Sequence, residues 1–538
     1  MDFFKGNYDY DIIIVGGGIS GLFTAYKLSN TDQKILLIEM HEELGGRVHT
    51  IYKTDFYFEC AAARFHKKHT KLLSLINELE LKDKIAPLPK KVDTFLRNKK
   101  NTTGYNTKEN LDLKYLLEEA VNQKNEIDKK KLMSLTFYQY LMAIYDSETV
   151  NFIKDSFGYD SEILELNAHA AMKMYSKDLF SDDDYYVLDG GLSQIIEKME
   201  SELKLKENVF IKRKTKVVDI DKGKLKVDNG DKYNYEKLIL TIPSEKLKKI
   251  DHFEEDVSFD SVKSINLLRI YAKYPTKNLW FKGMKRTITD NYIRNIIPIN
   301  EEAGLIMISY TDGIYAEMWD RYNKISEKFL ITMLHKEINS MFGIDPPKPE
   351  FLSTHYWENG IHLWKPGFDM DEEYDKMLKP YNDQEIYICG ESFSKKQGWI
   401  EGTLETCHDV LKMLKIKGYN IEDRKNDVGD LKKKKKIDTK KDDKKKKYTI
   451  DEVLKHDTWI VLDHNGEKPI YDVKRWIPQH PGGSSIKKGI EANKHYKYPD
   501  KHKQSPYEMW EKVHNKDILK KMILKENNLI EYIGDLHL

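Results

Sequence analysis

The stretch Asp-Ile-Ile-Ile-Val-Gly-Gly-Gly-Ile-Ser-Gly at residues 11–21 predicts a buried parallel strand that turns directly into a helix. Its apolar part is short and rich in β-branched residues, and apolar residues in helical spacing follow from Leu22 to Leu28. We expect Gly16 to form the tight turn, Gly18 to admit a diphosphate, and Gly21 to let the helix approach the strand. The stretch therefore predicts the first turn of a dinucleotide-binding unit.

A second apolar run follows at Ile35 to Ile38 and ends in Glu39. A carboxylate at this place accepts hydrogen bonds from the adenosine ribose hydroxyls and repels a 2′-phosphate. Strand, helix, second strand and acid thus occur in the order of a Rossmann-like domain.

The next motif separates flavin from nicotinamide cofactors. Residues 44–50 read Leu-Gly-Gly-Arg-Val-His-Thr, and the whole segment from Asp11 to Thr50 resembles the opening of FAD-dependent amine oxidases. The resemblance implies that Gly45, Gly46 and Arg47 close over the FAD diphosphate. Further segments resemble later motifs of that family in the same order: Tyr186–Leu192, Thr215–Ile220, Leu238–Pro243, Ile386–Glu391 and Gly398–Thr403.

The resemblance implies roles for individual residues in these motifs. The backbone of Val217 would meet the adenine, and Glu391 would reach the ribityl chain or the diphosphate. Glu401 belongs to the closing FAD motif and is expected among the cofactor-binding residues. Trp399 matches an aromatic residue beside the isoalloxazine ring. For the opposite aromatic wall, the segment Tyr356–Gly367 offers either His362 or Trp364, and the sequence leaves both open.

The segment Phe58–Arg64 is the candidate for substrate recognition. It resembles the segment of L-amino-acid oxidases in which an arginine holds the substrate carboxylate, although the family's glycine is Ala61 here. A guanidinium suits this role because it is permanently charged and offers a planar pair of donors. Arg64 is therefore the candidate anchor for a small amine or amino-acid substrate, with a structural salt bridge or a flavin-side contact as its alternatives.

One residue of the resembled family lacks a clear counterpart. Amine oxidases of this group usually place a lysine near the flavin's reactive nitrogen, and an ungapped count from Pro275 puts it at Asn266 or Leu267. Lys263 lies upstream of that place and Arg269 lies downstream. If the lysine is absent, we expect slow reoxidation by oxygen, which favours another electron acceptor.

The composition changes after about residue 420. Residues 424–447 contain 13 Lys and Arg against 5 Asp, a net charge of +8. Such a segment cannot bury enough apolar surface to fold. We therefore expect a disordered, lysine-rich linker at residues 421–447, which would also suit a weak contact with an anionic surface.

Residues 448–538 resemble cytochrome b5, through motifs that end in Trp-Ile-Pro-Gln-His-Pro-Gly-Gly at residues 476–483. The resemblance implies a small α+β domain that holds haem b with His480 as one axial iron ligand. The second ligand is expected at His514, with His502 as the runner-up. Two histidine ligands would fill both axial positions of the haem iron and leave none for oxygen. This haem would therefore transfer electrons.

The overall composition of the 538 residues is typical of a large intracellular protein. The mean hydropathy is −0.66, no 18-residue apolar run occurs, and the N-terminus lacks a secretory pattern. Three cysteines, Cys60, Cys389 and Cys407, argue against a disulfide scaffold. We expect a soluble, cytoplasmic protein without a membrane span.

These features predict an α/β fold with an α+β substrate part. Residues 1–420 would form a Rossmann-like FAD-binding domain, with interleaved substrate-binding insertions at about 70–185 and 245–370. The leading hypothesis is an FAD-dependent oxidoreductase that acts on the C–N bond of an amine or amino acid and passes electrons to oxygen or to its own haem. Desaturases and porphyrinogen oxidases share many of the motifs and form one alternative. A non-catalytic binding or assembly protein that works through its basic linker forms another.

Overall fold

In the computed structural model of the chain, strand β1 (Tyr10–Val15) runs directly into helix α1 (Ile19–Leu28), as predicted. Gly16 turns the chain with a φ of +109°, a conformation that other residues rarely adopt. A Cβ atom on Gly21 would lie 1.9 Å from the carbonyl oxygen of Gly16. Only glycine at this position lets α1 approach the end of β1 so closely.

The strand β1 lies inside a seven-stranded sheet whose order is β10-β2-β1-β13-β12-β11, with β19 paired to β13. Strands β10, β2, β1, β13 and β19 are parallel to their neighbours, whereas β12 and β11 extend β13 as an antiparallel meander. Helix α1 contacts α9 and α14. The bounds of these elements are: β2, Ile35–Ile38; α9, Ser193–Leu203; β10, Val209–Lys212; β11, Val217–Asp221; β12, Lys224–Val227; β13, Lys232–Leu240; β19, Ile386–Ile388; and α14, Ile400–Met413.

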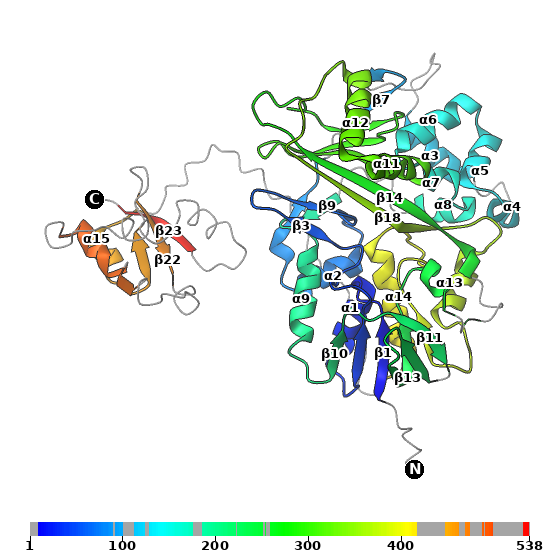
Figure 1. The fold of residues 1–538 in the computed structure, drawn as a ribbon, viewed down its shortest axis with the longest axis horizontal. Helices are drawn as coiled ribbons and strands as arrows, with labels where there is room; N and C mark the ends of the chain where they lie inside the picture. The colour runs from blue at the N-terminus through cyan, green and yellow to red at the C-terminus, as the bar shows by residue number, and fades with distance from the viewer. Residues whose placement is uncertain are drawn as a thin grey trace, which may run out of the picture. The chain divides into compact units, whose positions relative to one another are not determined.

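A second seven-stranded sheet, of order β18-β14-β17-β16-β15-β7-β8, forms the other large layer of the same unit. Figure 1 shows its two long strands, β14 and β18, running side by side, and they pair antiparallel. Its strands are: β7, Val92–Leu96; β8, Lys99–Lys100; β14, Val262–Lys273; β15, Arg286–Thr289; β16, Asn295–Asn300; β17, Leu305–Asp312; and β18, Phe351–Trp364.

Helices pack against this second sheet. Helices α11 and α12 follow β17, and α11 contacts β14, β17 and β18. A group of short helices, α3 to α8, precedes β9 in the chain, and α6 contacts β7 and β15. Their bounds are: α3, Leu113–Asn122; α4, Lys129–Ser134; α5, Phe137–Ile144; α6, Ser147–Phe157; α7, Asp160–Leu164; α8, Ala168–Tyr175; α11, Gly313–Ile325; and α12, Glu327–Phe342.

Two small sheets complete the unit. One pairs β3 with β4, and the other has the order β5-β9-β6. In the latter, Phe65 pairs with Tyr186 and His66 pairs with Tyr185, and Arg64 immediately precedes the first of these pairs. The remaining elements are: β3, Thr50–Tyr52; β4, Tyr57–Glu59; β5, Phe65–His66; α2, Thr70–Glu78; β6, Ile85–Pro87; β9, Tyr185–Leu188; α10, Ser244–Leu247; and α13, Met370–Leu378.

The chain divides into two compact units, Met1–Gly429 and Asp430–Leu538. In the second unit, the order β20-β23-β22-β21 forms a four-stranded sheet. Val453, Val461, Ile470 and Leu536 form its hydrophobic cluster. Its elements are: β20, Lys447–Tyr448; α15, Ile450–Val453; β21, Trp459–Val461; β22, Pro469–Asp472; and β23, Glu531–Leu536.

The structure describes only part of the chain: residues 9–89, 92–100, 112–123, 128–175, 185–221, 223–250, 253, 259–416, 447–461, 468–473, 487–488, 490–498 and 531–536. The predicted haem ligands His480 and His514, the alternative His502, and all of the predicted linker except Lys447 lie outside these residues. Within them, no helix has the length and apolar character needed to cross a membrane.

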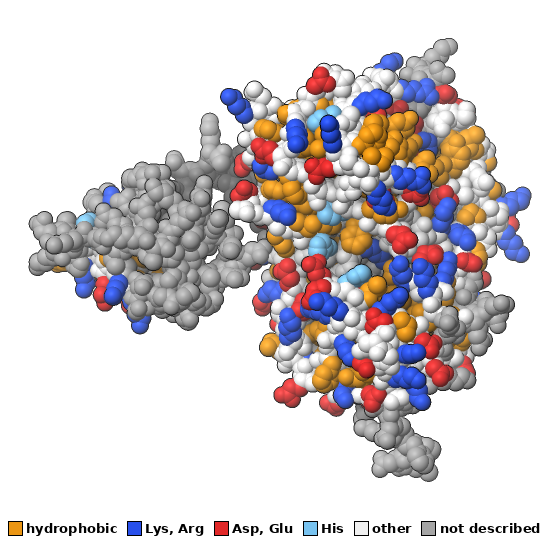
Figure 2. Space-filling view, in the orientation of Figure 1, with side chains coloured by type: hydrophobic (Ala, Val, Ile, Leu, Met, Phe, Trp, Pro, Cys, Tyr) orange, Lys and Arg blue, Asp and Glu red, His pale blue; other side chains and the backbone are white. Residues whose placement is uncertain are grey.

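The surface of the first unit carries both signs of charge. Figure 2 shows Lys and Arg side chains intermingled with Asp and Glu over the face in view. This mixture agrees with a formal net charge of only +1 for the whole chain.

The close approach at Gly21 generates a stability prediction. Gly21→Ala should lower the free energy of unfolding of the ligand-free protein by about 1–3 kcal/mol or more, because the added methyl meets a backbone oxygen that cannot move aside. Gly18→Ala is the matched control, because a Cβ there meets only the carbonyl oxygen of Gly45, at 3.9 Å. Urea unfolding monitored by tryptophan fluorescence measures both. Equal losses for the two variants would contradict the packing argument.

Candidate functional site

The turn after β1 leaves room for a ligand. Gly18 forms a bridge with Gly45, and the Gly45 N–H donates to the carbonyl oxygen of Gly17 at 2.8 Å. A Cβ on Gly18 would meet only the Gly45 oxygen, and one on Gly46 would lie 3.5 Å from the Cα of Gly18. Gly18 is the N-cap residue of α1, and it offers no side chain to accept from the first N–H groups of the helix. Open space beside these N–H groups fits the diphosphate of a dinucleotide.

The acid at the end of β2 lies beside this turn. Glu39 is buried, and its Oε2 accepts from the Gly17 N–H at 2.7 Å while its Oε1 accepts from the His41 N–H at 2.8 Å. Its carbonyl oxygen accepts from the Thr215 N–H at 3.0 Å. Val217, the first residue of β11, follows Thr215 by two residues. The bond therefore ties the segment predicted to meet the adenine to the acid predicted to bind the ribose.

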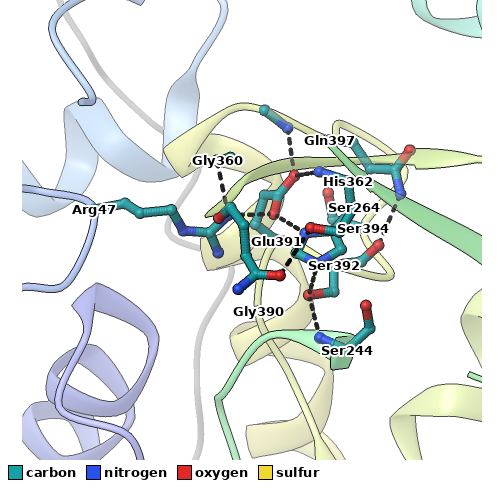
Figure 3. A network of polar contacts seen from close by, with 12 residues as sticks. Arg47, Ser244, Ser264, Gly360, His362, Gly390, Glu391, Ser392, Ser394 and Gln397 are labelled. Atoms are coloured by element: carbon teal, nitrogen blue, oxygen red, sulfur yellow. Dashed lines mark hydrogen bonds and ion pairs between the residues drawn. The ribbon is translucent and has the colours of Figure 1, made fainter. Parts of the chain in front are cut away.

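A buried carboxylate joins three distant segments, as Figure 3 shows. Glu391 Oε2 lies 2.7 Å from Arg47 Nη1 and 2.7 Å from His362 Nδ1. Its Oε1 accepts from the backbone N–H of His362 at 2.8 Å and of Gly398 at 2.9 Å. Burial opposes ionisation, but His362 and Arg47 outweigh it and hold the pKa of Glu391 well below its ordinary value. Arg47 Nη1 also donates to the carbonyl oxygen of Gly360 at 3.0 Å.

The two aromatic candidates on β18 are both fully buried. The Trp364 backbone N–H donates to Gln397 Oε1 at 2.9 Å, and its indole N–H donates to the carbonyl oxygen of Ser394 at 3.0 Å. His362 is held by Glu391, and its Nε2 lies 3.4 Å from Ser392 Oγ. Because neither ring has exposed surface, the structure does not choose between them, and the predicted second wall stays a prediction.

The structure brings Trp399 and Arg64 together. The Trp399 ring stacks on Tyr185 with centroids 6.0 Å apart and meets the ring of His69 edge-on at 4.9 Å. The Arg64 guanidinium carbon lies 5.2 Å from the Tyr185 centroid and 5.9 Å from that of Trp399. Burial lowers the pKa of His69 to about 3, so its ring is neutral at pH 7.

Glu401 has partners within the fold. It is fully buried, and its Oε1 and Oε2 accept from the backbone N–H groups of Lys71 at 3.0 Å and of Leu72 at 2.9 Å. These are amides of the first turn of α2, which α14 contacts. The carboxylate thus caps a helix, and its predicted contact with a cofactor stays a prediction.

The segment in which a lysine was sought is the N-terminal half of β14. Asn266 Nδ2 donates to Tyr356 Oη at 3.0 Å and to Glu317 Oε1 at 3.2 Å. Leu267 is buried against Gly360, whose Cβ would lie 2.5 Å from the leucine side chain. Lys263 Nζ pairs with a carboxylate of Glu165 at 2.8 Å. The side chains of Asn266 and Lys263 are therefore held by polar partners of the protein.

Sequence reasoning missed a group of residues that contact Arg64 or lie beside it. Arg64 Nη2 donates to Tyr159 Oη at 3.3 Å, and the same oxygen accepts from Arg286 Nη2 at 3.2 Å. The Tyr159 ring meets that of Tyr310, over which Arg269 lies at 4.5 Å. These residues come from three strands and from the turn before α7, so no local spacing in the sequence could have identified them.

Glu391 and Glu401 generate opposite predictions for the pH dependence of stability. The pKa of Glu391 is lowered on folding, so its contribution is present above its unfolded pKa and is lost as the pH falls toward its folded pKa. Burial raises the pKa of Glu401, so its contribution is present at low pH and is lost as the pH rises through its folded pKa.

The test compares Glu391→Gln and Glu401→Gln with the parent protein by urea unfolding between pH 4 and 7. The stability gap between the parent and Glu391→Gln should be smaller at pH 4 than at pH 7, by on the order of 1 kcal/mol. The gap for Glu401→Gln should change in the opposite direction. Gaps that move in the same direction would refute the assigned electrostatics.

Comparisons with known proteins show the family and the fold of this chain. A family model described as flavin containing amine oxidoreductase matches residues 19–409. An uncharacterized protein of Acanthamoeba polyphaga mimivirus is 22% identical over 490 residues, covering 77% of this chain and 94% of that protein. L-amino-acid oxidase of Crotalus adamanteus is 35% identical over 71 residues, which are 13% of this chain and 14% of the oxidase.

A solved structure of a putrescine oxidase redesigned in its cofactor binding superposes with a TM-score of 0.61. It is 16% identical and covers 75% of this chain and 99% of its own. The fold is therefore the mixed α/β fold of that oxidase. The chain belongs to the flavin-containing amine oxidoreductase family, and it is an FAD-dependent amine oxidase.

Proposed function

We propose that the enzyme oxidises the C–N bond of an amino acid whose carboxylate is held by Arg64. One observation carries the proposal: the Arg64 guanidinium lies against Trp399 and Tyr185, and no carboxylate of the described residues comes within 4.0 Å of it. A guanidinium deep in a protein without an anionic partner is unfavourable unless a ligand supplies the anion.

The cofactor site proposed for FAD runs from the turn at Gly18 past Glu39 to Arg47. This assignment is supported by the open space at Gly18 and Gly46, and by the position of Glu39 at the end of β2. Bound FAD would supply an acceptor for the hydride that leaves the carbon next to the amine.

The residues of this chain would bind and orient the substrate. Arg64 would fix the carboxylate with two parallel hydrogen bonds, which sets the direction of the neighbouring C–H bond. The rings of Trp399 and Tyr185 would exclude water from that side. Loss of hydride from carbon and of a proton from nitrogen leaves an imine, which water converts to an oxo acid with release of ammonia. An apolar polyene would leave Arg64 unpaired, so the desaturase alternative is disfavoured.

Arg64 generates a prediction that separates an amino-acid oxidase from a plain amine oxidase. Arg64→Met should reduce kcat/KM for flavin reduction by amino acids by about tenfold or more, because a charge-assisted hydrogen-bond pair is lost. The amine that lacks the carboxylate should be affected much less. Anaerobic stopped-flow bleaching of the flavin measures both, and the flavin content should stay unchanged.

Arg321→Gln is the matched control, because this arginine is exposed on α11 and pairs with Glu317, one turn away. Equal losses for an amino acid and its decarboxylated amine in Arg64→Met would refute the carboxylate anchor. Flavin that no amine bleaches, although dithionite does, would refute the oxidase proposal and favour a binding protein.

We further propose that residues 448–538 form a cytochrome b5-like domain whose haem b accepts electrons from the reduced flavin. The proposal is supported by the motif at residues 476–483, with His480 as ligand and His514 as the second. The lysine-rich segment at residues 421–447 would serve as a tether that keeps the two modules at high effective concentration.

His480→Ala should abolish the haem absorption bands and leave the flavin bands unchanged, because the iron loses an axial ligand. His514→Ala should do the same, whereas His502→Ala should not. Visible spectra of the purified full chain, recorded before and after anaerobic addition of substrate, measure both binding and electron transfer. A haem that stays oxidised while the flavin is reduced would refute the electron relay.

A further inference from the structure

Three arginines converge on two touching tyrosine rings. Arg269 on β14 and Tyr310 on β17 are directly paired residues, so their side chains project from the same face of the sheet. The Arg269 guanidinium carbon lies 4.5 Å from the Tyr310 centroid. The rings of Tyr310 and Tyr159 meet edge to face at 5.4 Å, and Tyr159 Oη accepts from both Arg64 and Arg286.

The partners of these guanidiniums are neutral. Arg269 donates to the backbone oxygen of Glu59 at 2.9 Å, and Arg286 donates to Asn295 Oδ1 at 3.1 Å. The Nε atom of Arg286 is buried and has no hydrogen-bond partner in the ranges that the structure describes. Among the residues that the structure describes, no carboxylate lies within 4.0 Å of Arg64, Arg269 or Arg286.

Another arginine nearby shows what a structural guanidinium looks like in this protein. Arg294 is 1% exposed, and its Nη2 lies 2.6 Å from a carboxylate oxygen of Asp160. Arg64 and Arg286, in contrast, keep partial solvent access although they lie deep in the protein. Both guanidiniums are thus half-buried and keep contact with solvent, and a largely desolvated charge with neutral partners favours an anionic ligand.

The surrounding carboxyl groups offset the positive charge of the cluster only in part. Burial raises the pKa of Glu162 to about 7 and that of Glu59 to about 7. Each is bonded elsewhere: Glu162 accepts from Tyr175 Oη at 3.5 Å, and Glu59 accepts from the backbone N–H of Leu192 at 2.7 Å. A third, Asp312, has its pKa raised by burial to about 6 and accepts from the Ser161 N–H at 2.9 Å.

The phenol at the centre reports the same excess of positive charge. Burial raises the pKa of Tyr159, but Arg64 and Arg286 outweigh this effect and lower it below its ordinary value. The same positive charge that lowers the pKa of this phenol would attract a carboxylate.

We propose that the substrate is an amine with two carboxylates, such as an acidic amino acid, one held by Arg64 and the other by Arg286 and Arg269. This inference rests on the proposed function and extends it. Arg64 contacts Trp399, so the carboxylate at the reacting end belongs there. A substrate with one carboxylate would leave two guanidiniums without an anion in the interior, whereas a second carboxylate fits their planar donors.

Binding to the FAD-loaded full chain tests the inference without turnover. Glutarate carries two carboxylates and no amine, and butyrate has one carboxylate on a comparable chain. Glutarate should bind at least about tenfold more tightly than butyrate, as measured by calorimetry or by perturbation of the flavin spectrum. Arg286→Gln should remove most of this preference, Arg286→Lys should restore part of it because it keeps the charge, and Arg321→Gln should leave it unchanged.

Equal affinities for glutarate and butyrate in the parent protein would overturn the inference, as would displacement of glutarate by inorganic phosphate at equal concentration. Turnover then separates the two proposals. If neutral or cationic amino acids reduce the flavin with a higher kcat/KM than acidic ones, the dicarboxylate inference fails and the amino-acid oxidase stands. If no amino acid reduces the flavin while glutarate still binds selectively, the oxidase proposal fails and the dicarboxylate site stands.

Discussion

The carboxylate of Glu391 is the interaction on which the rest of the site depends. A buried carboxylate is tolerated only when charges and N–H groups surround it. Glu391 meets this condition with the Arg47 side chain from the glycine-rich N-terminal segment, both N–H groups of His362 on β18, and the Gly398 amide before α14. One charge thus holds the parallel sheet, the long strand β18 and the start of α14 together.

This constraint places the groups around the proposed substrate site. Gly398 is followed by Trp399, the N-cap of α14, and Trp399 packs on Tyr185 beside Arg64. Glu401, which is buried on the first turn of α14, joins this helix to α2 by accepting hydrogen bonds from two backbone N–H groups of the first turn of α2. The aromatic side of the site is therefore anchored by two buried glutamates of opposite electrostatic character, one ionised by its partners and one with a pKa raised by burial.

Two groups of arginines in the first unit differ in the charge of their hydrogen-bond partners. Arg47 and Arg294 are paired with carboxylates and hold segments together. Arg64, Arg269 and Arg286 have neutral partners and surround two tyrosines. Because an unpaired interior charge lowers stability, such a cluster is best explained by an anionic ligand that completes it. The proposal of an anionic substrate rests on these three arginines, with which no carboxylate of the described part of the chain forms an ion pair.

The sequence by itself determined the parts of the molecule whose chemistry is local. The strand, glycine turn and helix at residues 11–28, the acid at Glu39 and the loop at Arg47 follow from residue order, because each depends on neighbours along the chain. The partners of Glu391, Glu401 and Arg64 were decided only by the tertiary structure. Tyr159, Arg269, Arg286 and Tyr310 meet through the register of β14 and β17 and the chain after α6, and no periodicity in sequence encodes contacts between segments so far apart.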